Sequence, residues 1–261
     1  MGVAASGSPC LAGLVARKTE IETGYWNFRG LGAPMRMICY YGGAQAWKDV
    51  KYEVKKRSAG EEGEARWQSK EWEKVVKPTL RDINPFVNLP YVLNRTTGEV
   101  VSQSNAVYLY LGRLFGLNGS SWKEQIANEQ VLFQSYSLWL EVVDLVYPFK
   151  MNKDADAFHA SLDSHLKKHL PAYYDKFESW LRRTETVFFC GDRPCTADFH
   201  VWEMLDQHEL MANRYQKPSP LRGFDKLKAY YEIVRSLPKL QPYFKSSDAR
   251  LPVNNKMAFF Y

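Results

Sequence analysis

The sequence predicts an α+β protein of two domains, a small N-terminal α/β domain followed by an all-α helical bundle domain. A strand, a turn and a helix are predicted in that order over residues 25–40, with proline in the first helical turn. Residues 88–101 predict a hairpin around a Thr-Thr-Gly turn. From Trp122 onward, apolar residues recur with the period of a helix and not of a strand. A chain of 261 residues suits two domains of ordinary size.

The expected domain boundaries follow the same pattern. Residues 1–22 are small and polar, with too little apolar periodicity for a core element, so we expect a flexible N-terminal extension. The α/β domain is predicted over 23–116 and the helical domain over 122–245. The tail, 246–261, contains proline and ends in an apolar run, so it should pack back onto the protein.

Composition favours a globular protein of a reducing compartment. The chain is 45% hydrophobic and 25% charged, and it has no apolar run of membrane-spanning length, so no membrane span is expected. Its four cysteines show no metal-ligand spacing and follow no secretory leader. The formal net charge of +6 comes from Lys and Arg dispersed among Asp and Glu, without a nucleic-acid-binding motif. Nucleic acid is therefore not an expected partner.

Four segments carry a family resemblance through their order and spacing. They are GYWNFRGLGAPMR at 24–36, NLPYVL with SQSNAVYLYLGR at 88–113, TADF at 196–199, and KSSDARLPVNNKMAFF at 245–260. On these segments the chain resembles the mu class of cytosolic glutathione transferases, and more loosely the sigma and alpha classes, over residues 23–260.

The resemblance implies a thioredoxin-like glutathione-binding domain followed by a helical domain that holds the electrophile. It also implies a cytoplasmic homodimer that acts in detoxification. The implied reaction joins the thiol of reduced glutathione to small hydrophobic electrophiles. Glutathione is then a substrate, and no cofactor is expected.

Tyr25 is the expected catalytic residue. Thiol addition requires a thiolate, and a free cysteine thiol with a pKa near ~8.5 is mostly protonated at neutral pH. Tyr25 lies at one end of the first predicted strand and matches the family's catalytic tyrosine, whose hydroxyl would donate a hydrogen bond to the thiolate. An isolated tyrosine here would be taken for a half-buried strand residue. The surrounding string Tyr-Trp-x-x-Arg-Gly favours the catalytic role.

Two further segments match the family's glutathione contacts. In Asn88-Leu89-Pro90 the family holds the bond before proline in the cis form, which turns the backbone of Leu89 toward the ligand. A trans proline on an edge strand is the alternative. Gln103 and Ser104 lie at a predicted helix start, where free amides would bind the γ-glutamyl carboxylate. Ser104 is also the expected N-cap of a helix over 106–115, and both roles can hold together.

The glycyl end of glutathione is matched by residues of the first strand, the turn after it and the following loop. The resemblance assigns Trp26, Leu31, Trp72 and Lys77 to it. Lys74 is an alternative cation, and Trp67 competes with Trp72, because the loop is longer than in the family and its register between Trp67 and Lys77 is open.

Tyr147 matches the family's electrophile-site tyrosine, which can assist the leaving group; core packing is the alternative. Asn254 and Asn255 replace a more apolar or hydroxylated pair, which predicts a more polar substrate pocket. Ser137 stands where the family has an aspartate that reaches the neighbouring subunit's glutathione, so that contact is left open.

Three other patterns are assigned to folding. Cys195 to Asp198 matches a capping box in which Cys replaces the usual Ser or Thr. His165 and His169 are four residues apart but have no evident third ligand, so no metal site is predicted. Cys39 is expected to be a packing residue.

The N-terminus fits the N-myristoylation pattern, with Gly2 as the acceptor and Cys10 as a second, palmitoylated anchor. Such acylation would tether the enzyme to a membrane, whereas a disordered leader or a short targeting peptide is the alternative.

Two functions other than glutathione conjugation also stay open for this protein. One is a glutathione-dependent isomerase or peroxidase of the same fold, and the other is a non-catalytic ligand-binding or structural member.

Overall fold

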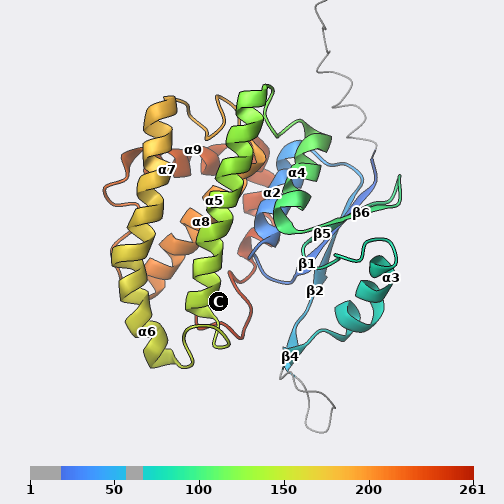
Figure 1. Cartoon of the computed structure of the whole chain (residues 1–261), viewed down its shortest axis with the longest axis horizontal. Coiled ribbons are helices and arrows are strands. Elements are labelled where there is room, and N and C mark those ends of the chain that lie inside the picture. The colour runs from blue at the N-terminus through green and yellow to red at the C-terminus, as the bar shows by residue number, and fades with distance from the viewer. Residues whose placement is uncertain (1–18, 57–66) are drawn as a thin grey trace, which may run out of the picture.

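The structure is a computed structural model that describes residues 19–56 and 67–261. A sheet-containing domain and a helical domain lie side by side (Figure 1). The predicted α+β fold class is confirmed, because a small mixed sheet is followed by helices. Gly2 and Cys10, the expected acylation sites, lie outside the described residues.

The first domain is built around a four-stranded sheet. Its elements in chain order are β1 (Ile21–Trp26), α2 (Gly32–Gly42), β2 (Trp47–Tyr52), β3 (Lys55–Lys56), β4 (Trp67–Gln68), η1 (Glu71–Val76), α3 (Lys77–Arg81), β5 (Tyr91–Asn94), β6 (Glu99–Ser102) and α4 (Ser104–Phe115). The strand order is β2-β1-β5-β6, and β1 pairs in parallel with β2 and antiparallel with β5. The parallel pair needs a crossover, which α2 supplies. Gly24 is required in β1, because a Cβ there would overlap the ring of Tyr91 on β5.

The second domain is helical. Its elements are α5 (Trp122–Val146), α6 (Ala155–Ser164), η2 (His165–His169), α7 (Leu170–Thr184), α8 (Thr196–Arg214), α9 (Asp225–Ser236), η3 (Pro238–Leu240), α10 (Gln241–Lys245) and η4 (Asp248–Arg250). The Ser121 hydroxyl caps α5 by accepting from the Glu124 amide at 3.2 Å. Within residues 19–56 and 67–261, no helix has the length and apolarity that crossing a membrane requires.

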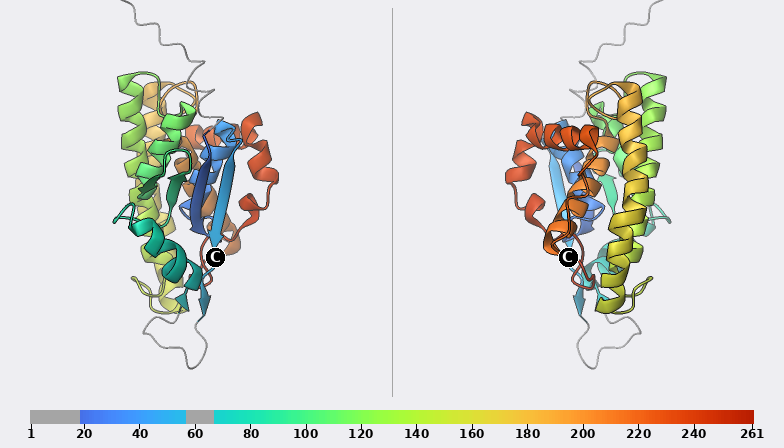
Figure 2. Two further views of the ribbon diagram at one scale, coloured as in Figure 1. Left: turned by 90° about the vertical axis from the view of Figure 1, so that its right-hand side faces the viewer. Right: turned by 90° about the vertical axis from the view of Figure 1, so that its left-hand side faces the viewer.

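One apolar core joins the two domains. It runs from β1 and α2 through α4 to α8, which is buried along most of its length. In the left view of Figure 2, strands β1 and β2 lie between the C-terminal helices and helices α4 and α5. Arg29, buried in the turn after β1, donates to Glu203 at 2.7 Å and to Asp206 at 2.6 Å, both on α8. Pairing compensates the cost of burying these charges, and the network ties the β1 turn to α8.

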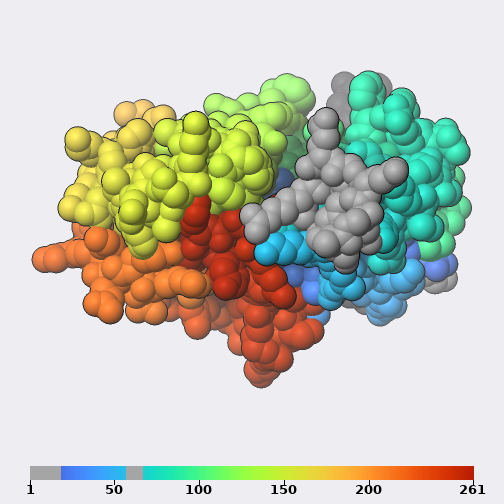
Figure 3. All heavy atoms as spheres, turned by 90° about the horizontal axis from the view of Figure 1, so that it is seen from below, coloured from blue at the N-terminus to red at the C-terminus, as the bar shows by residue number. Residues whose placement is uncertain are grey.

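The C-terminal tail returns to the boundary between the domains (Figure 3). The Arg29 amide donates to the Pro252 carbonyl at 2.8 Å, and the Phe259 amide donates to the Val146 carbonyl at 2.8 Å. Phe260 is only 3% exposed. The tail therefore contacts both the turn after β1 and the end of α5, which puts it beside the space between the domains.

Candidate functional site

A cleft of about 330 Å³ opens between the two domains. Its lining comes from β1 and the turn after it, from the β4 region, from the residue before cis Pro90, and from the end of α5 and the tail. The site residues predicted from the sequence that line it are Tyr25, Trp26, Leu31, Leu89 and Tyr147. Further apolar surface comes from Trp67, Trp139, Val143, Phe149 and Met257. Such a cleft suits a small apolar ligand beside a few polar groups.

Tyr25 is the penultimate residue of β1 and is 4% exposed. Burial raises the pKa of its hydroxyl well above the usual range, although the backbone amide of Leu31 acts in the opposite direction. The hydroxyl is therefore neutral at physiological pH and available as a hydrogen-bond donor. Gly30, with φ of 37°, lets the turn close over it, because a Cβ there would lie 2.8 Å from the Tyr25 oxygen.

Two buried side chains hold this turn in place. The Tyr108 hydroxyl, on α4, donates to the Leu31 carbonyl at 2.7 Å. Arg36, on α2, donates to the Phe28 carbonyl at 3.1 Å and to Asp49 at 2.8 Å. Sequence reasoning missed both residues. Arg36 is signalled by a lone charge inside an apolar helix start, whereas a tyrosine in an apolar helix gives no such signal.

The bond between Leu89 and Pro90 is cis, as the family resemblance implied. The Asn88 amide donates to the Ser102 hydroxyl at 2.9 Å, and that hydroxyl donates back to the Asn88 carbonyl at 2.9 Å. The end of β6 thus fixes the backbone just before Leu89. Leu89 faces the cleft, whereas the Pro90 ring is buried and Asn88 is exposed.

Helix α4 begins without a side-chain cap. The expectation that Ser104 is the N-cap is wrong, because Ser104 is the first helical residue and Gln103 takes the cap position with φ of 73° and ψ of 121°. A non-glycine residue in this conformation is strained, and such strain clusters at ligand sites. The first amides of a helix have no partner within it. The start of α4 therefore offers backbone donors and the positive end of the helix dipole to an anion.

Tyr147 follows α5 directly and is 8% exposed. Its hydroxyl accepts from the Asn255 amide at 3.4 Å, and burial raises its pKa to about 12. It stays protonated near neutral pH and lines the same cleft as Tyr25. The structure thus brings together one tyrosine from each domain.

Comparison with known proteins agrees with this architecture. A family model described as "Glutathione S-transferase, C-terminal domain" matches residues 141–247. Glutathione S-transferase Mu 1 of Oryctolagus cuniculus is 31% identical over 239 residues, which are 90% of this chain and 95% of that protein. The chain belongs to the glutathione S-transferase family. Glutathione S-transferase Mu 3 of Homo sapiens is 28% identical over 92% of this chain and 95% of its own length.

Solved structures share the fold of this glutathione S-transferase. The Ascaris lumbricoides glutathione S-transferase has a TM-score of 0.64 at 25% identity, over 89% of this chain and 98% of its own. The glutathione S-transferase Blo t 8 has a TM-score of 0.72 at 18% identity over 91% of this chain and 98% of its own.

The structure does not bring Trp72 to the cleft of this glutathione S-transferase. Trp72 is 2% exposed and stacks on Tyr91, with ring centroids 5.8 Å apart, beside Tyr52. The Lys77 ammonium lies over the Trp72 ring at 5.9 Å and does not line the cleft either. Trp67, the competing tryptophan, does line it. The physical reason is the π-helical turn η1, which directs Trp72 into the aromatic core of the sheet.

The two asparagines of the tail line the cleft, but their side chains also hold the tail. The Asn254 amide nitrogen donates to the Phe260 carbonyl at 3.0 Å, and the Asn255 side-chain oxygen accepts from the Met257 amide at 2.8 Å. One polar atom of each asparagine is thus engaged within the tail, and most of the remaining lining is apolar. The structure gives no support to a markedly polar pocket.

The residues assigned to folding lie away from the cleft. The Asp198 carboxylate accepts from the Cys195 amide at 2.7 Å and from the Phe189 amide at 3.0 Å. His165 is buried and donates through Nε2 to His208, 3.1 Å away, because the His208 Nδ1 hydrogen is taken by the Met204 carbonyl. His169 is exposed.

Proposed function

We propose that the protein joins the thiol of reduced glutathione to small hydrophobic electrophiles, with the Tyr25 hydroxyl stabilising the thiolate. One observation carries this proposal: Tyr25, whose hydroxyl burial keeps neutral, lines an apolar cleft between two domains. Membership of the glutathione S-transferase family supports glutathione as the thiol donor. In this proposal glutathione is a substrate and no cofactor takes part.

The proposed glutathione site runs along the edge of the sheet domain. The backbone of Leu89, positioned by Asn88 and cis Pro90, pairs with the ligand's cysteinyl unit. The start of α4, at Gln103 and Ser104, receives the γ-glutamyl carboxylate. Trp26 and Leu31 add apolar contacts. Trp67 replaces Trp72 as the proposed tryptophan, because Trp67 is the one that lines the cleft.

The chemistry follows from the position of the two tyrosines. A donor in a water-poor cleft favours the thiolate over the thiol, so the pKa of the bound thiol falls. The sulfur anion then forms a bond to the electrophilic carbon, and the negative charge passes to the leaving group or to the acceptor atom. The neutral Tyr147 hydroxyl is a suitable donor to that developing charge.

The test compares wild type with Tyr25→Phe, using a chlorodinitrobenzene-type electrophile and a separate measurement of glutathione affinity. We expect the variant to bind glutathione normally and to lose at least about tenfold in kcat/KM, roughly 1.4 kcal/mol of barrier. Tyr110→Phe is the matched control, because the Tyr110 hydroxyl accepts from Asn94 on the sheet, and this variant should keep the full rate. Equal rates in wild type and Tyr25→Phe would exclude the proposed role of Tyr25.

The same experiment separates the other functions. If wild type binds glutathione but conjugates none of a broad electrophile panel, an isomerase, a peroxidase or a carrier function becomes the better description. Activity of wild type toward a hydroperoxide or an endoperoxide would then identify which of these applies.

A homodimer is part of the proposal. Large apolar side chains are exposed on α5 and on the loop after α3: Phe133 at 60%, Leu140 at 44% and Phe86 at 76%. Phe133 and Leu140 are two helical turns apart and so share a face. A second copy of the chain would remove this surface from water. Phe133→Asp should shift the sedimenting species from dimer to monomer, while Val187→Asp, at an exposed site on the helical domain, should not.

Cytoplasmic location, with a membrane tether through an acyl chain on Gly2, completes the proposal. The pattern at the N-terminus supports the tether. Mass analysis of the native protein tests for the acyl chain, and an unmodified Gly2 would exclude the proposed membrane tether.

A further inference from the structure

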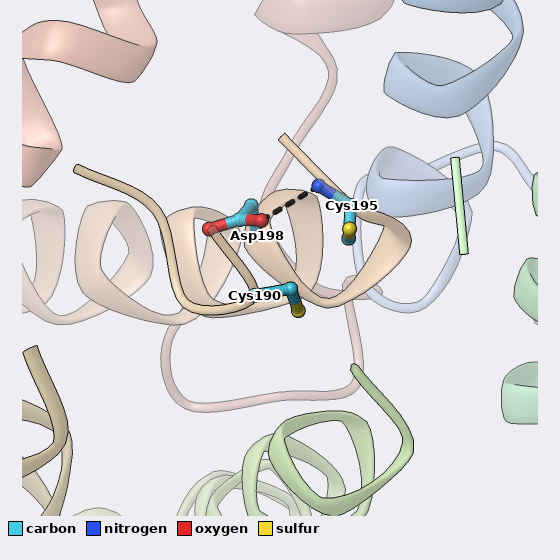
Figure 4. Close-up of side chains that lie close together, drawn as sticks. All are labelled: Cys190, Cys195 and Asp198. Carbon is cyan, nitrogen blue, oxygen red and sulfur yellow. Dashed lines mark hydrogen bonds between the residues drawn. The ribbon is translucent and has the colours of Figure 1, made fainter. Parts of the chain in front are cut away.

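Two cysteines and an aspartate meet where α8 begins, outside the cleft. Cys190 lies in the loop after α7, Cys195 directly precedes α8, and Asp198 lies in its first turn (Figure 4). One ligand atom from each, the two Sγ atoms and a carboxylate oxygen, all lie within 4.8 Å of one another. The three residues are 8%, 5% and 0% exposed. Within the described part of the chain, no other set of three His, Cys, Asp or Glu side chains brings its ligand atoms this close together.

The two Sγ atoms and the carboxylate oxygen form a triangle, and its size suits a single ion. Zn²⁺ binds thiolate sulfur at about 2.3 Å and carboxylate oxygen at about 2.1 Å, so its tetrahedral ligands are roughly 3.5–3.8 Å apart. The observed upper limit of 4.8 Å lets a single ion bind all three atoms after a contraction of at most about 1.3 Å. Asn128 Oδ1 lies 3.9 Å from the Cys190 sulfur, but it already accepts from the Ala197 amide at 2.9 Å, so the fourth ligand would be water.

The surroundings already orient these ligands. The Asp198 carboxylate is held by the amides of Cys195 and Phe189, which leaves each oxygen a further lone pair. Hydrogen bonds of this kind hold a metal ligand in the orientation that binding needs. The loop that carries Cys190 is closed by the Phe188 amide, which donates to the Gly191 carbonyl at 3.1 Å. Backbone hydrogen bonds therefore hold both the loop and the carboxylate near the positions that binding would require.

The charge balance also favours a cation with soft ligands. Two thiolates and one carboxylate exceed the charge of a divalent ion by one, and the positive end of the α8 dipole offsets that excess. Thiolate ligands select zinc-like ions over magnesium or calcium. We propose that Cys190, Cys195 and Asp198 bind a thiophilic divalent cation such as Zn²⁺, which clamps the loop after α7 to the start of α8.

Binding would proceed by exchange of protons for the ion. Each thiol gives up its proton as the metal–sulfur bond forms, and no electron changes hands. The sequence did not predict this site, because Cys-x₄-Cys-x₂-Asp is not a familiar ligand spacing. The site is independent of the proposed transferase activity, so either proposal can fail without the other.

The test uses the full chain in a Cys10→Ser background, freed of metal and kept reduced without added thiol. Zn²⁺ is titrated against a chromophoric chelator. We expect one ion per chain, and at least about tenfold weaker binding for Cys190→Ala and for Cys195→Thr. Cys195→Thr should fold well, because threonine is a good N-cap. Zn²⁺ should also raise the Tm of wild type but not of Cys190→Ala.

Two matched controls decide whether the binding is specific. Cys39→Ala removes a fully buried thiol outside the triangle, and His169→Ala removes an exposed imidazole near Glu141. Both should bind Zn²⁺ as wild type does. The proposal is overturned if either control loses the ion as the triangle variants do, or if Cys190→Ala binds normally. Absence of bound Zn²⁺ in wild type, or a Cys190–Cys195 disulfide that persists under reducing conditions, overturns it as well.

Discussion

Helices α4 and α8 begin in opposite ways. Before α4, Gln103 has φ of 73° and no side chain of the described residues caps the first amides. At α8, the Thr196 amide donates to the Leu117 carbonyl at 2.8 Å, and the Ala197 amide donates to Asn128 Oδ1 at 2.9 Å. The fully buried Asp198 carboxylate also accepts from the amide of Cys195, the N-cap residue. One helix start is left open beside the sheet edge, and the other is satisfied inside the protein. The difference teaches that backbone amides at a helix start are free to bind an anion only where the chain itself leaves them without an acceptor.

The largest expected effect is at the satisfied start. Asp198→Ala leaves the amides of Cys195 and Phe189 buried without an acceptor, so the free energy of unfolding should fall by roughly 3 kcal/mol. Urea denaturation measures this. Asp192→Ala, at an exposed position of the same loop, should change stability by less than about 0.5 kcal/mol. The glutathione affinity of the folded Asp198→Ala variant should be unchanged. A large loss of affinity would show that the start of α8 also contributes to glutathione binding, against the contrast drawn with α4.

At the open start the effect should be on affinity. Ser104→Ala removes a buried hydroxyl from the first turn of α4, and glutathione binding should weaken about tenfold, or roughly 1.4 kcal/mol. Its stability should change little, because no cap bond is lost. Ser121→Ala, which does remove a cap bond from α5, should cost about 0.5–1 kcal/mol of stability and leave affinity intact. Calorimetric titration with glutathione and urea denaturation, applied to both variants, test whether Ser104→Ala loses mainly affinity and Ser121→Ala mainly stability.

The buried histidines of α8 predict acid sensitivity. Burial lowers the pKa of His208 from 6.5 to about 4, opposed by its bond to the Met204 carbonyl. Because the folded-state pKa is depressed, the neutral ring stabilises the fold above about pH 6.5, and this contribution is lost as pH falls toward about 4. Its neighbours are His165, whose pKa burial lowers to about 3, and Tyr174; Glu141 lies beyond His165.

The pH effect is measured by urea denaturation at about pH 7 and about pH 5.5. Wild type should lose roughly 1 kcal/mol more over this interval than His208→Gln does. The exposed His159→Gln is the control and should follow wild type. An identical loss in all three proteins would show that His208 ionises normally in the folded state.

The smallest expected effect compares two buried tyrosines. Tyr108, on α4, donates to the Leu31 carbonyl at 2.7 Å, and Tyr230, on α9, donates to the Asp198 carbonyl at 2.7 Å. Tyr108→Phe should raise the pKa of the bound glutathione thiol by about 0.5, worth roughly 0.7 kcal/mol, because the turn carrying Leu31 loosens beside Tyr25. The ultraviolet absorbance of the thiolate, followed against pH, measures this.

Tyr230→Phe removes a bond of the same length at α8 and should leave the thiol pKa unmoved. Both variants should lose similar stability, about 1 kcal/mol. If both shift the thiol pKa equally, Tyr108 acts on the fold as a whole and is not a positioning residue.

The family resemblance assigned Tyr25 and Tyr147 to the site, and the structure places both at the cleft, while their roles stay predictions. It also implied the cis bond at Pro90. Sequence reasoning did not identify Tyr108, because an aromatic residue in an apolar helix does not by itself indicate a hydrogen bond to a turn far away in sequence. It assigned Trp72 to the ligand with Trp67 as the competing residue, because the register of the lengthened loop depends on how η1 turns.

The sequence by itself determined the order of elements, the change from sheet to helix, and the family, because these depend on local period, turn residues and ordered motifs. Tertiary structure alone decided which tryptophan faces the cleft, which helix start stays open, and that Cys190, Cys195 and Asp198 meet. These outcomes depend on packing between segments. A side chain's surroundings are set by whichever distant residues fill the space around it, and local pattern carries no record of them.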